Sequence, residues 1–316
     1  MRLSNKITIS EAVPEDSHLS SIWGGAFFHP LFVKNGAKYL GLEGSAKTIE
    51  HDGNKIGISN MLFRKRPGIK VATIPLLFQY FGPVFYNSIY EENFLKSVID
   101  HYMETCDFIY LSFTPEFNSI GELKNGWKIH RSSTLAITDS ELSSWGNNFR
   151  DDVKNKINKA NREKIQVMRS DAFNEHLWEL SFARKGMKPP IKPSDLNKWC
   201  SELLNDSMLH IYSAVAGGRE VAFRGQLIYG RFAYDWIAGS DPEYHHLGIN
   251  QLLMAEIGSE LRKKEVAIWD LVDGSIKGIG EFKKSFGAVE YHHWQVYKAI
   301  NIKGKLFGAL RRLKNA

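Results

Sequence analysis

The chain has 316 residues, of which 43% are hydrophobic and 24% charged. This composition excludes a disordered or fibrous protein and suits two globular domains of ordinary size. Lysine and arginine exceed aspartate and glutamate by 41 to 35, which gives a formal net charge of +6. That excess fits an anionic partner such as a phosphate, a nucleic acid or an acidic lipid, without choosing among them.

The cysteine content and the N-terminus bear on location. Cys106 and Cys200 form neither a metal-ligand spacing nor a disulfide framework, which indicates a reducing compartment. The N-terminal stretch lacks the apolar region of a signal peptide, so we expect a cytoplasmic protein. Residues 71–90 carry no charge, but Pro75, Gly82 and Pro83 would break a membrane helix. We therefore predict buried strands and loops in this segment.

The first half of the sequence predicts a mixture of helices and strands. Apolar side chains recur at helical spacing between Phe94 and Tyr102, and runs rich in β-branched and aromatic residues indicate strands. We expect helices over residues 29–40 and 90–104, and strands over residues 45–50, 55–63, 70–77, 108–113 and 127–138.

A basic segment over residues 149–164 joins the two halves. Its lysines and arginines outnumber its acids by six to three. Apolar residues at i, i+4, i+8 and i+11 predict a helix with one narrow apolar stripe. The segment is either a solvated helix anchored by that stripe or a cationic wall beside an anionic substrate. The stripe consists of Phe149, Val153, Ile157 and Ala160.

The second half carries the clearest architectural signal, a run of strands separated by short turns. The turns A-G-G-R and Y-G-R contain the glycines typical of hairpins, so residues 208–216, 220–229 and 231–240 are expected to form an antiparallel meander. Two helices precede the meander and a proline-containing turn follows it. The other expected elements are helices over residues 172–185, 193–205, 249–263 and 278–286, a turn over 241–248, and strands over 266–272 and 291–300.

This order of strands and helices resembles the C-terminal part of the GNAT acyltransferase fold. In that fold the turn before the helix holds the pyrophosphate of an acyl-CoA, because free N–H groups and the helix dipole attract phosphate there. The junction here is Y-H-H-L-G-I-N-Q, residues 244–251, and the resemblance implies that His245, Gly248 and Asn250 bind the donor. The expected fold class is α/β, with two GNAT-like lobes that each hold a mixed, mostly antiparallel sheet flanked by helices.

Four short stretches of the sequence resemble the FemAB-like branch of that superfamily, whose members carry two GNAT-like halves and add amino acids to peptidoglycan precursors. The resemblance covers most of the chain from about residue 25 to residue 300. We expect an N-terminal lobe over 1–145, a C-terminal lobe with the catalytic motifs over 146–300, and a basic tail helix over 301–316. The matching stretches are P-L-L-F-Q-Y-F-G-P-V-F (Pro75–Phe85), F-R-D-D-V-K-N-K-I-N-K-A (Phe149–Ala160), W-D-L-V-D-G-S (Trp269–Ser275) and F-K-K-S-F-G (Phe282–Gly287).

The last of these stretches contains two lysines that a helix makes inequivalent. At about 100° per residue, Lys283 borders the apolar stripe that includes Phe282, whereas Lys284 points the opposite way into solvent. Lys283 must therefore run along the stripe, pair with a buried acid or face a cleft. The resemblance implies the cleft, because the matching lysine of Fem-type enzymes lies at the reaction centre. A fixed ammonium can stabilise the oxyanion that forms there.

Acyl transfer to an amine also requires a group that accepts the proton of that amine. Asp235 lies within an aromatic strand, and Asp270 and Asp273 lie at the end of the strand before the lysine helix. Glu281 is the remaining acid near the expected site. Asp235 is alternatively an exposed edge residue, and Asp273 with Gly274 is alternatively an ordinary turn.

The histidines offer a base or a phosphate contact rather than a metal site. His245 and His246 either contact phosphate, act as a base or are inert turn residues. His292 and His293 are adjacent and face opposite sides of a strand, so we expect no metal site.

The basic tail, residues 301–314, shows the spacing of an amphipathic helix. It either packs on the protein or rests on the inner face of a membrane, where a lipid-linked precursor would be found. The residues expected on its apolar face are Leu306, Phe307, Leu310 and Leu313.

These observations and the resemblance predict an acyltransferase that moves an acyl or aminoacyl group to an amine of a cell-envelope or glycan precursor. The resemblance implies a UDP- or lipid-linked anionic acceptor in the cleft between the lobes, with its phosphates near Arg150, Lys154 and Lys156. Lys283, with Phe282 packed beside it, would stabilise the oxyanion. Asp235 or Asp270 would steer the proton.

The acyl donor stays open between aminoacyl-tRNA and acyl-CoA, and no permanently bound cofactor is expected. With aminoacyl-tRNA as donor, tRNA is a partner. One alternative function is an acyl-CoA-dependent N-acetyltransferase acting on a small amine or amino sugar. The other is a non-catalytic nucleic-acid or membrane-surface binder built on a GNAT-like fold.

Overall fold

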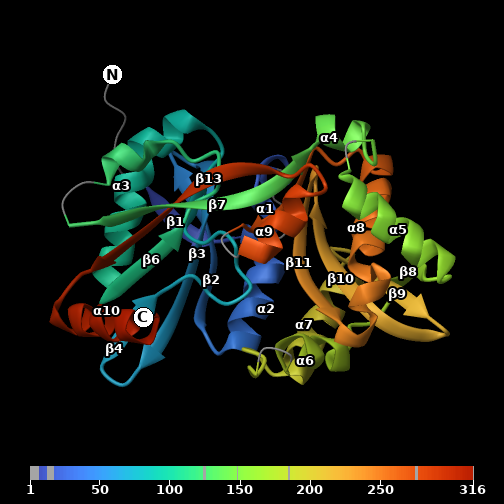
Figure 1. Cartoon of the computed structure of the whole chain (residues 1–316). Coiled ribbons are helices and arrows are strands. Elements are labelled where there is room, and N and C mark those ends of the chain that lie inside the picture. Colours follow the sequence, from blue (N-terminus) through green and yellow to red (C-terminus); the bar gives the residue numbers. More distant parts are fainter. Residues whose placement is uncertain are drawn as a thin grey trace. The chain divides into compact units, whose positions relative to one another are not determined.

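The computed structural model describes residues 7–12, 18–123, 126–147, 149–183, 186–274 and 277–315. The chain forms two compact units (Figure 1): unit 1 comprises Met1–Ser132 and His292–Ala316, and unit 2 comprises Ser133–Tyr291. The predicted ranges 1–145, 146–300 and 301–316 divide the chain linearly. The boundaries of the units instead fall inside the long strands β7 (Lys128–Thr138) and β13 (Val289–Ala299), so the tail helix belongs to unit 1.

The sheet of unit 1 begins with hairpin pairing. Strands β2 and β3 are joined at Asp52 and Gly53, which both have positive φ angles of 50° and 76°, as a tight hairpin turn requires. Strands β4 and β6 run parallel, and the other pairs of this unit are antiparallel. The strand order is β1 (Thr8–Glu11), β2 (Glu43–His51), β3 (Asn54–Arg66), β4 (Ile69–Ala72), β6 (Phe108–Ser112) and β13, with β5 (Pro83–Phe85) paired to β3.

The helices of unit 1 have recognisable start and stop signals. Helix α1 (Gly25–Phe28) leads into α2 (Pro30–Leu40), which begins with a proline and ends at Gly41 in the left-handed conformation. Helix α3 (Ser88–Thr105) is capped by the Asn87 side chain, which accepts a hydrogen bond from the Tyr90 amide at 3.0 Å. The large side chains buried in this unit include Phe27, Phe32, Tyr80, Phe81, Phe94 and Tyr102.

The uncharged segment 71–90 is not a helix over its length. It contains the end of β4, the strand β5 and the start of α3, which confirms the predicted strands and loops. Among the residues that the structure describes, no helix is long and apolar enough to cross a membrane.

Helix α10 (Ile302–Asn315) packs on unit 1 through its glycines. A Cβ atom at Gly304 would lie 1.8 Å from the carbonyl oxygen of Asp107, and one at Gly308 would lie 3.1 Å from the ring of Phe108. Phe307 adds an edge contact to Phe108, with ring centroids 5.1 Å apart. The helix therefore approaches β6 closely because it has no side chain at these positions.

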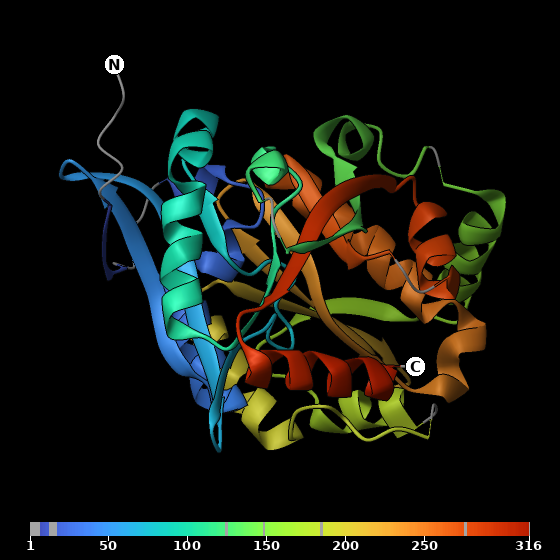
Figure 2. The ribbon, with the colours of Figure 1, turned by 90° about the vertical axis from the view of Figure 1, so that its left-hand side faces the viewer.

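This packing corrects the predicted apolar face of the tail helix. Phe307 contacts Phe108 of β6, but Leu306 and Leu310 are 64% and 63% exposed. In Figure 2, α10 is the red helix in the foreground. The side chain of Leu313 lies outside the described part of the chain.

The sheet of unit 2 contains the meander that the sequence predicts. Strands β9, β10 and β11 pair antiparallel in sequence order. Strand β12 runs parallel to β11, and β7 and β8 (Gln166–Ser170) close the two ends with antiparallel pairing. The order is β7, β12 (Ile268–Asp273), β11 (Phe232–Ser240), β10 (Arg219–Tyr229), β9 (Leu209–Ala216) and β8.

Helices cover both faces of this sheet (Figure 1). Helices α5 (Asp151–Arg162) and α8 (Ile249–Lys263) pack together on one face, while α6 (Glu175–Ala183) and α7 (Pro193–Asn205) cover the other. The predicted stripe of α5 is confirmed, because Phe149, Val153 and Ala160 are buried and Ile157 packs against the same core. The remaining elements are α4 (Asp139–Ser143), the 3-10 turn η3 (Pro242–Leu247) and α9 (Lys277–Lys284). The predicted α/β fold with mixed, mostly antiparallel sheets and flanking helices is thus confirmed.

Candidate active site

The site of interest lies where two parallel strands part in unit 2. Strands β11 and β12 pair from Phe232 and Ile268 to Tyr234 and Asp270. Beyond this point the pairing of β10 with β11 shifts register at Trp236. Gln226 pairs with Asp235 and the preceding Gly225 pairs with Ile237, so Trp236 is skipped. Register shifts of this kind re-aim side chains and are frequent beside active sites.

Strand β12 is also strained here. Val272 has a φ angle of 55°, which is rare for a β-branched residue. The Asp270 carboxylate holds this bend, since Oδ1 accepts a hydrogen bond from the Val272 amide at 2.8 Å and another from the Thr134 hydroxyl. The bend directs the carbonyl oxygen of Asp273 toward α9, where it accepts a hydrogen bond of 2.7 Å from Lys283 Nζ.

The two lysines of α9 differ as predicted. Lys284 is exposed and pairs with Glu290 at 3.2 Å, whereas Lys283 is only 4% exposed. An ammonium has three N–H donors, and among the described residues the Asp273 carbonyl is the hydrogen-bond acceptor that Lys283 contacts. Burial lowers the pKa of Lys283, and the positive charge of Arg224 lowers it further. Nearby carboxylates act in the opposite direction, and Asp235 has the largest effect among them.

Asp235 is buried and bound from two sides. Both of its carboxylate oxygens accept hydrogen bonds from Arg224, with Nε to Oδ1 at 3.0 Å and Nη2 to Oδ2, and Gln226 Nε2 donates to Oδ1 at 2.8 Å. Gln226 is held in turn by Trp269, whose Nε1–H donates to Oε1 at 2.7 Å. Burial on its own would raise the pKa of Asp235. The charge and hydrogen bonds of Arg224 lower it, Lys283 and Gln226 act in the same direction, and together they hold the pKa below its usual range.

A pocket of about 440 Å³ opens beside this network. Arg224 forms part of its wall and lies over the ring of Phe282, with 5.8 Å between Cζ and the ring centroid. Asp235 occupies two of the five N–H donors of the guanidinium, and the rest have no acceptor among the described residues. The described residues that line the pocket include no carboxylate; they are Trp178, Ser181, Phe182, Arg224, Ala238, Gly239, Ser240, His245, Asn250, Gly278, Ile279 and Phe282.

Trp178 and the start of helix α8 also line this pocket. Trp178 is 5% exposed, and its indole N–H has no hydrogen-bond partner in the described part of the chain. Helix α8 begins at Gly248 without a side-chain cap and without an acid in its first turn, and its second residue, Asn250, lines the pocket. Free amides at a helix start attract anions, so the pocket suits a ligand with carbonyl or phosphate oxygens.

His245 supplies the pocket with a group able to exchange a proton. Its Nε2 atom lies 2.7 Å from the hydroxyl oxygen of Ser240, and the Ser240 amide donates to Ser181 Oγ at 3.0 Å. These contacts fix the η3 turn against β11 and α6. Of the residues that the sequence singles out, the structure thus places His245, Asn250 and Phe282 in one pocket wall.

Other predicted residues lie elsewhere in unit 2. Gly248 packs against α5, since a Cβ atom there would lie 2.4 Å from the carbonyl oxygen of Lys156. Lys154 and Lys156 are exposed on α5, and Arg150, the exposed N-cap residue of this helix, forms two hydrogen bonds with Asp152 at 2.9 and 2.8 Å. The contacts of these residues with a donor or acceptor stay predictions. Ser275, which ends one of the matching stretches, lies outside the described residues.

Sequence reasoning missed Arg224 and Trp178. A register signal for Arg224 was present, because a hairpin closed at Gly230 places Asp235 opposite Gln226, and Arg224 lies two residues further along the same face. An arginine within an apolar strand, diagonal to a strand aspartate, indicates a buried ion pair. Trp178 gave no such signal, because only the packing of α6 on β11 brings it to the pocket.

The histidine pair in β13 does not form a shared site. His293 is buried and His292 is exposed, so the two rings point to opposite faces, as expected of neighbours on a strand. In the part of the chain that the structure describes, no group of three or more His, Cys, Asp or Glu residues is placed to hold a metal ion.

The part of the chain that carries this site matches a family model. Residues 147–284 match the family described as "Acetyltransferase (GNAT) domain". No curated protein sequence matches the chain.

Solved structures show the same fold over nearly the whole length. FemX is similar with a TM-score of 0.66 and 11% identity, over 91% of this chain and 96% of that one. The C-terminal domain of a putative lysylphosphatidylglycerol synthetase from Agrobacterium fabrum is similar with a TM-score of 0.58 and 12% identity, over 87% of this chain and 89% of that one. A tandem GNAT protein from the clavulanic acid biosynthesis pathway is similar with a TM-score of 0.53 and 8% identity, over 94% of this chain and 99% of that one.

These identities establish shared architecture rather than shared substrates. They confirm the fold that the resemblance implies. Residues 147–284 match a GNAT acetyltransferase domain, and the chain has the fold of FemX and of a tandem GNAT protein.

Proposed function

We propose that the enzyme transfers an acyl or aminoacyl group to an amine of a cell-envelope or glycan precursor, and that the pocket of unit 2 holds the acyl donor. The observation that carries this proposal is the set of N–H donors around a pocket whose described wall has no carboxylate. Such a wall favours an ester or thioester carbonyl and nearby phosphate over a cationic ligand.

In the proposed reaction the acceptor amine attacks the carbonyl carbon of the donor. The carbonyl oxygen becomes an oxyanion, and the C–O or C–S bond to the leaving group then breaks while the amine loses its proton. The unoccupied N–H donors of Arg224 and Lys283 supply positive charge where the oxyanion develops. Asp235 holds Arg224 in place, and the strained bend at Val272 aims the carbonyl that holds Lys283.

The amine must also lose its proton to a group in the site. Asp235 and Asp270 are each engaged by other groups, and the lowered pKa of Asp235 makes it a weak base. We therefore propose that these acids orient the cations and that His245, in the pocket wall, accepts the proton. Imidazole is the side chain most often used for this step.

The donor remains either acyl-CoA or aminoacyl-tRNA. The matching family, an acetyltransferase domain, favours acyl-CoA. The FemX and lysylphosphatidylglycerol synthetase neighbours favour an aminoacyl donor and an envelope acceptor. A small amine or amino sugar is the acceptor of the second candidate function.

A thermal-shift screen with acetyl-CoA, alanyl-tRNA and a UDP-linked peptidoglycan precursor tests the proposal, followed by transfer assays with the donors that shift. Ligand at 100 times its dissociation constant stabilises a protein by about 2.7 kcal/mol, so a shift of several degrees is expected with one donor. The variant Ile279→Trp fills the pocket without changing charge and should abolish that shift.

Ile129→Trp is the matched control, because Ile129 is 41% exposed in unit 1 and Ile279 is 39% exposed in the pocket wall. This control should keep the shift. A donor shift that survives in Ile279→Trp, or transfer by neither donor, would contradict the proposal.

A further inference from the structure

We propose that unit 1 carries a docking site for an anionic lipid at a membrane surface. An arginine-lined pocket would receive the headgroup phosphate, and the outer face of α10 would contact the apolar edge of the lipid layer. This site lies within unit 1 and does not depend on the acyl-transfer function proposed for unit 2.

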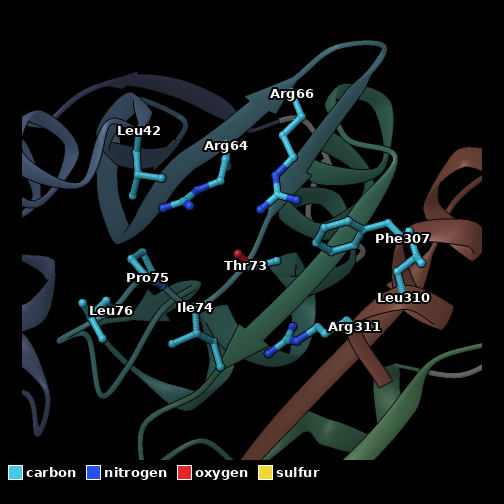
Figure 3. Close-up of a pocket in the computed structure, with 10 residues that line it drawn as sticks. All are labelled: Leu42, Arg64, Arg66, Thr73, Ile74, Pro75, Leu76, Phe307, Leu310 and Arg311. Carbon is cyan, nitrogen blue, oxygen red and sulfur yellow. The ribbon is translucent and has the colours of Figure 1, made fainter. Parts of the chain in front are cut away.

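The pocket has a volume of about 550 Å³ and lies between β3, the segment after β4, and α10. Figure 3 shows Arg64 and Arg66 extending from β3 on one side and Arg311 extending from α10 on the other. Arg64 and Arg66 project from one face of the strand because they are two residues apart. The remaining described lining residues are Leu42, Thr73, Ile74, Pro75, Leu76, Phe307 and Leu310.

The guanidinium groups of this pocket have no acidic partner among the described residues. Arg64 donates a long hydrogen bond of 3.4 Å to the Leu40 carbonyl. Arg66 lies over the ring of Phe307 at 5.8 Å, and Arg311 lies over the ring of Tyr110 at 4.1 Å.

Lys65, between the two arginines on β3, behaves differently. It points to the opposite face of the strand, where it approaches Glu43 at 3.9 Å. The charge that is left uncompensated is therefore gathered on the pocket side. Converging guanidiniums with free N–H groups are suited to bidentate recognition of phosphate.

The outer face of α10 adds an apolar stripe next to this charge. Ile302, Leu306 and Leu310 recur every four residues and are 75%, 64% and 63% exposed. Lys303 and Lys305 are exposed on either side of the stripe. An apolar stripe between lysines on a surface helix is the pattern of a helix that lies in a membrane interface.

The stripe and the pocket are continuous, because Leu310 belongs to both. Leu76 on the other side of the pocket is 37% exposed and extends the apolar surface. A phosphate bound between the arginines would therefore have aliphatic side chains at its edge, where the glycerol and acyl chains of a lipid begin.

This combination favours a lipid over other phosphate ligands. A soluble phosphate would contact the arginines but leave the leucines in water. Single-stranded RNA is held by aromatic side chains that stack on bases beside the basic groove. Here the rings of Phe307 and Tyr110 lie against Arg66 and Arg311, and the exposed apolar residues beside the arginines are aliphatic.

Vesicle flotation tests the proposal with the full chain. Vesicles of phosphatidylcholine alone are compared with vesicles that also contain phosphatidylglycerol. We expect binding to the anionic vesicles, and a loss on the order of 100-fold in affinity for Arg64→Gln/Arg66→Gln/Arg311→Gln, at about fivefold for each basic residue. Leu306→Ser/Leu310→Ser should also weaken binding, by at least about tenfold.

Matched variants separate the pocket from general charge. Lys34→Gln/Lys55→Gln/Arg131→Gln removes the same charge from exposed positions of unit 1 outside the pocket and should weaken binding by less than about threefold. Replacing the pocket arginines by lysines keeps the charge but removes the bidentate geometry. This variant should bind clearly more weakly than the wild type.

Several results would overturn the proposal. They are absence of binding to anionic vesicles, equal losses in the pocket and control variants, and wild-type binding by the lysine variant. Competition by inorganic phosphate with no contribution from Leu306 and Leu310 would identify a soluble-phosphate site instead. Binding of tRNA that the pocket variants abolish, without vesicle binding, would identify a nucleic-acid site. Thermal melting of each variant establishes that unit 1 is folded.

Discussion

Replacing Lys283 by methionine removes the buried ammonium while keeping a side chain of similar length. Lys283 is 4% exposed, and one of its N–H donors is held by the Asp273 carbonyl at 2.7 Å. Methionine also removes the cost of burying a charge, which is the cause of the lowered pKa of Lys283. The loss of a hydrogen bond from a charged group, about 1.5–3 kcal/mol, is therefore offset, and we expect the variant to fold.

The expected effect on catalysis is much larger than that on stability. Removing one donor of an oxyanion site lowers kcat by about 10²–10³, or about 2.7–4 kcal/mol of transition-state stabilisation. Arg224 remains in the variant, so some activity should persist. Because the ammonium acts on charge that develops in the transition state, KM should change by less than about threefold.

The assay is steady-state transfer from the donor that the thermal-shift screen selects, with urea unfolding measured on the same samples. Lys284→Met is the matched control, since Lys284 is the next residue of α9, is exposed and pairs with Glu290 at 3.2 Å. It should keep wild-type kcat. Full turnover in folded Lys283→Met would refute the role assigned to the ammonium.

Three further outcomes follow from the contacts of unit 2. Asp235→Asn leaves Arg224 buried without its counter-charge, so urea unfolding should show a loss of about 3–5 kcal/mol; a loss under about 1 kcal/mol would contradict this. Because the pKa of Asp235 is lowered in the folded state, its stabilisation is complete above the unfolded value of about 3.9 and lost as pH falls through the folded pKa. The stability gap between wild type and Asp235→Asn should therefore shrink below pH about 4, and a gap that widens there would oppose the assignment. Gly248→Ala places a Cβ atom 2.4 Å from the Lys156 carbonyl at a φ of 81°, so it should cost about 1–3 kcal/mol more than Gly217→Ala, which has a φ of 56° and no neighbour within 4 Å.

Much of unit 2 could be predicted because its signals are local. The glycine turns set the meander, the period of the apolar residues set α5 and α8, and the helical angle between Lys283 and Lys284 separated a buried lysine from an exposed one. Each of these features depends on residues that are close in sequence.

Features that depend on distant segments could not be predicted. The tail helix is amphipathic by sequence, but close approach of Gly304 to Asp107 decides which face is covered, and so Leu306 and Leu310 face solvent. The boundaries of the units fall inside β7 and β13, where no linker composition marks them. The pocket wall combines residues from α6, β10, β11 and α9, which sequence spacing does not relate.

Sequence also could not show how the acids near the site are used. Asp235 and Asp270 have the residue type of a general base, but their partners determine what they do. The bidentate contact with Arg224 and the bond from the Val272 amide are properties of the folded site.

Hydrogen exchange with and without donor tests most directly whether the pocket of unit 2 holds it. The measurement uses the wild-type chain with acetyl-CoA and with alanyl-tRNA in separate experiments. We expect one donor to slow exchange of amides in β11, in the first turn of α8 and in α9, where the pocket wall lies. The account would be contradicted if neither donor slowed exchange, or if the slowed amides lay only in unit 1.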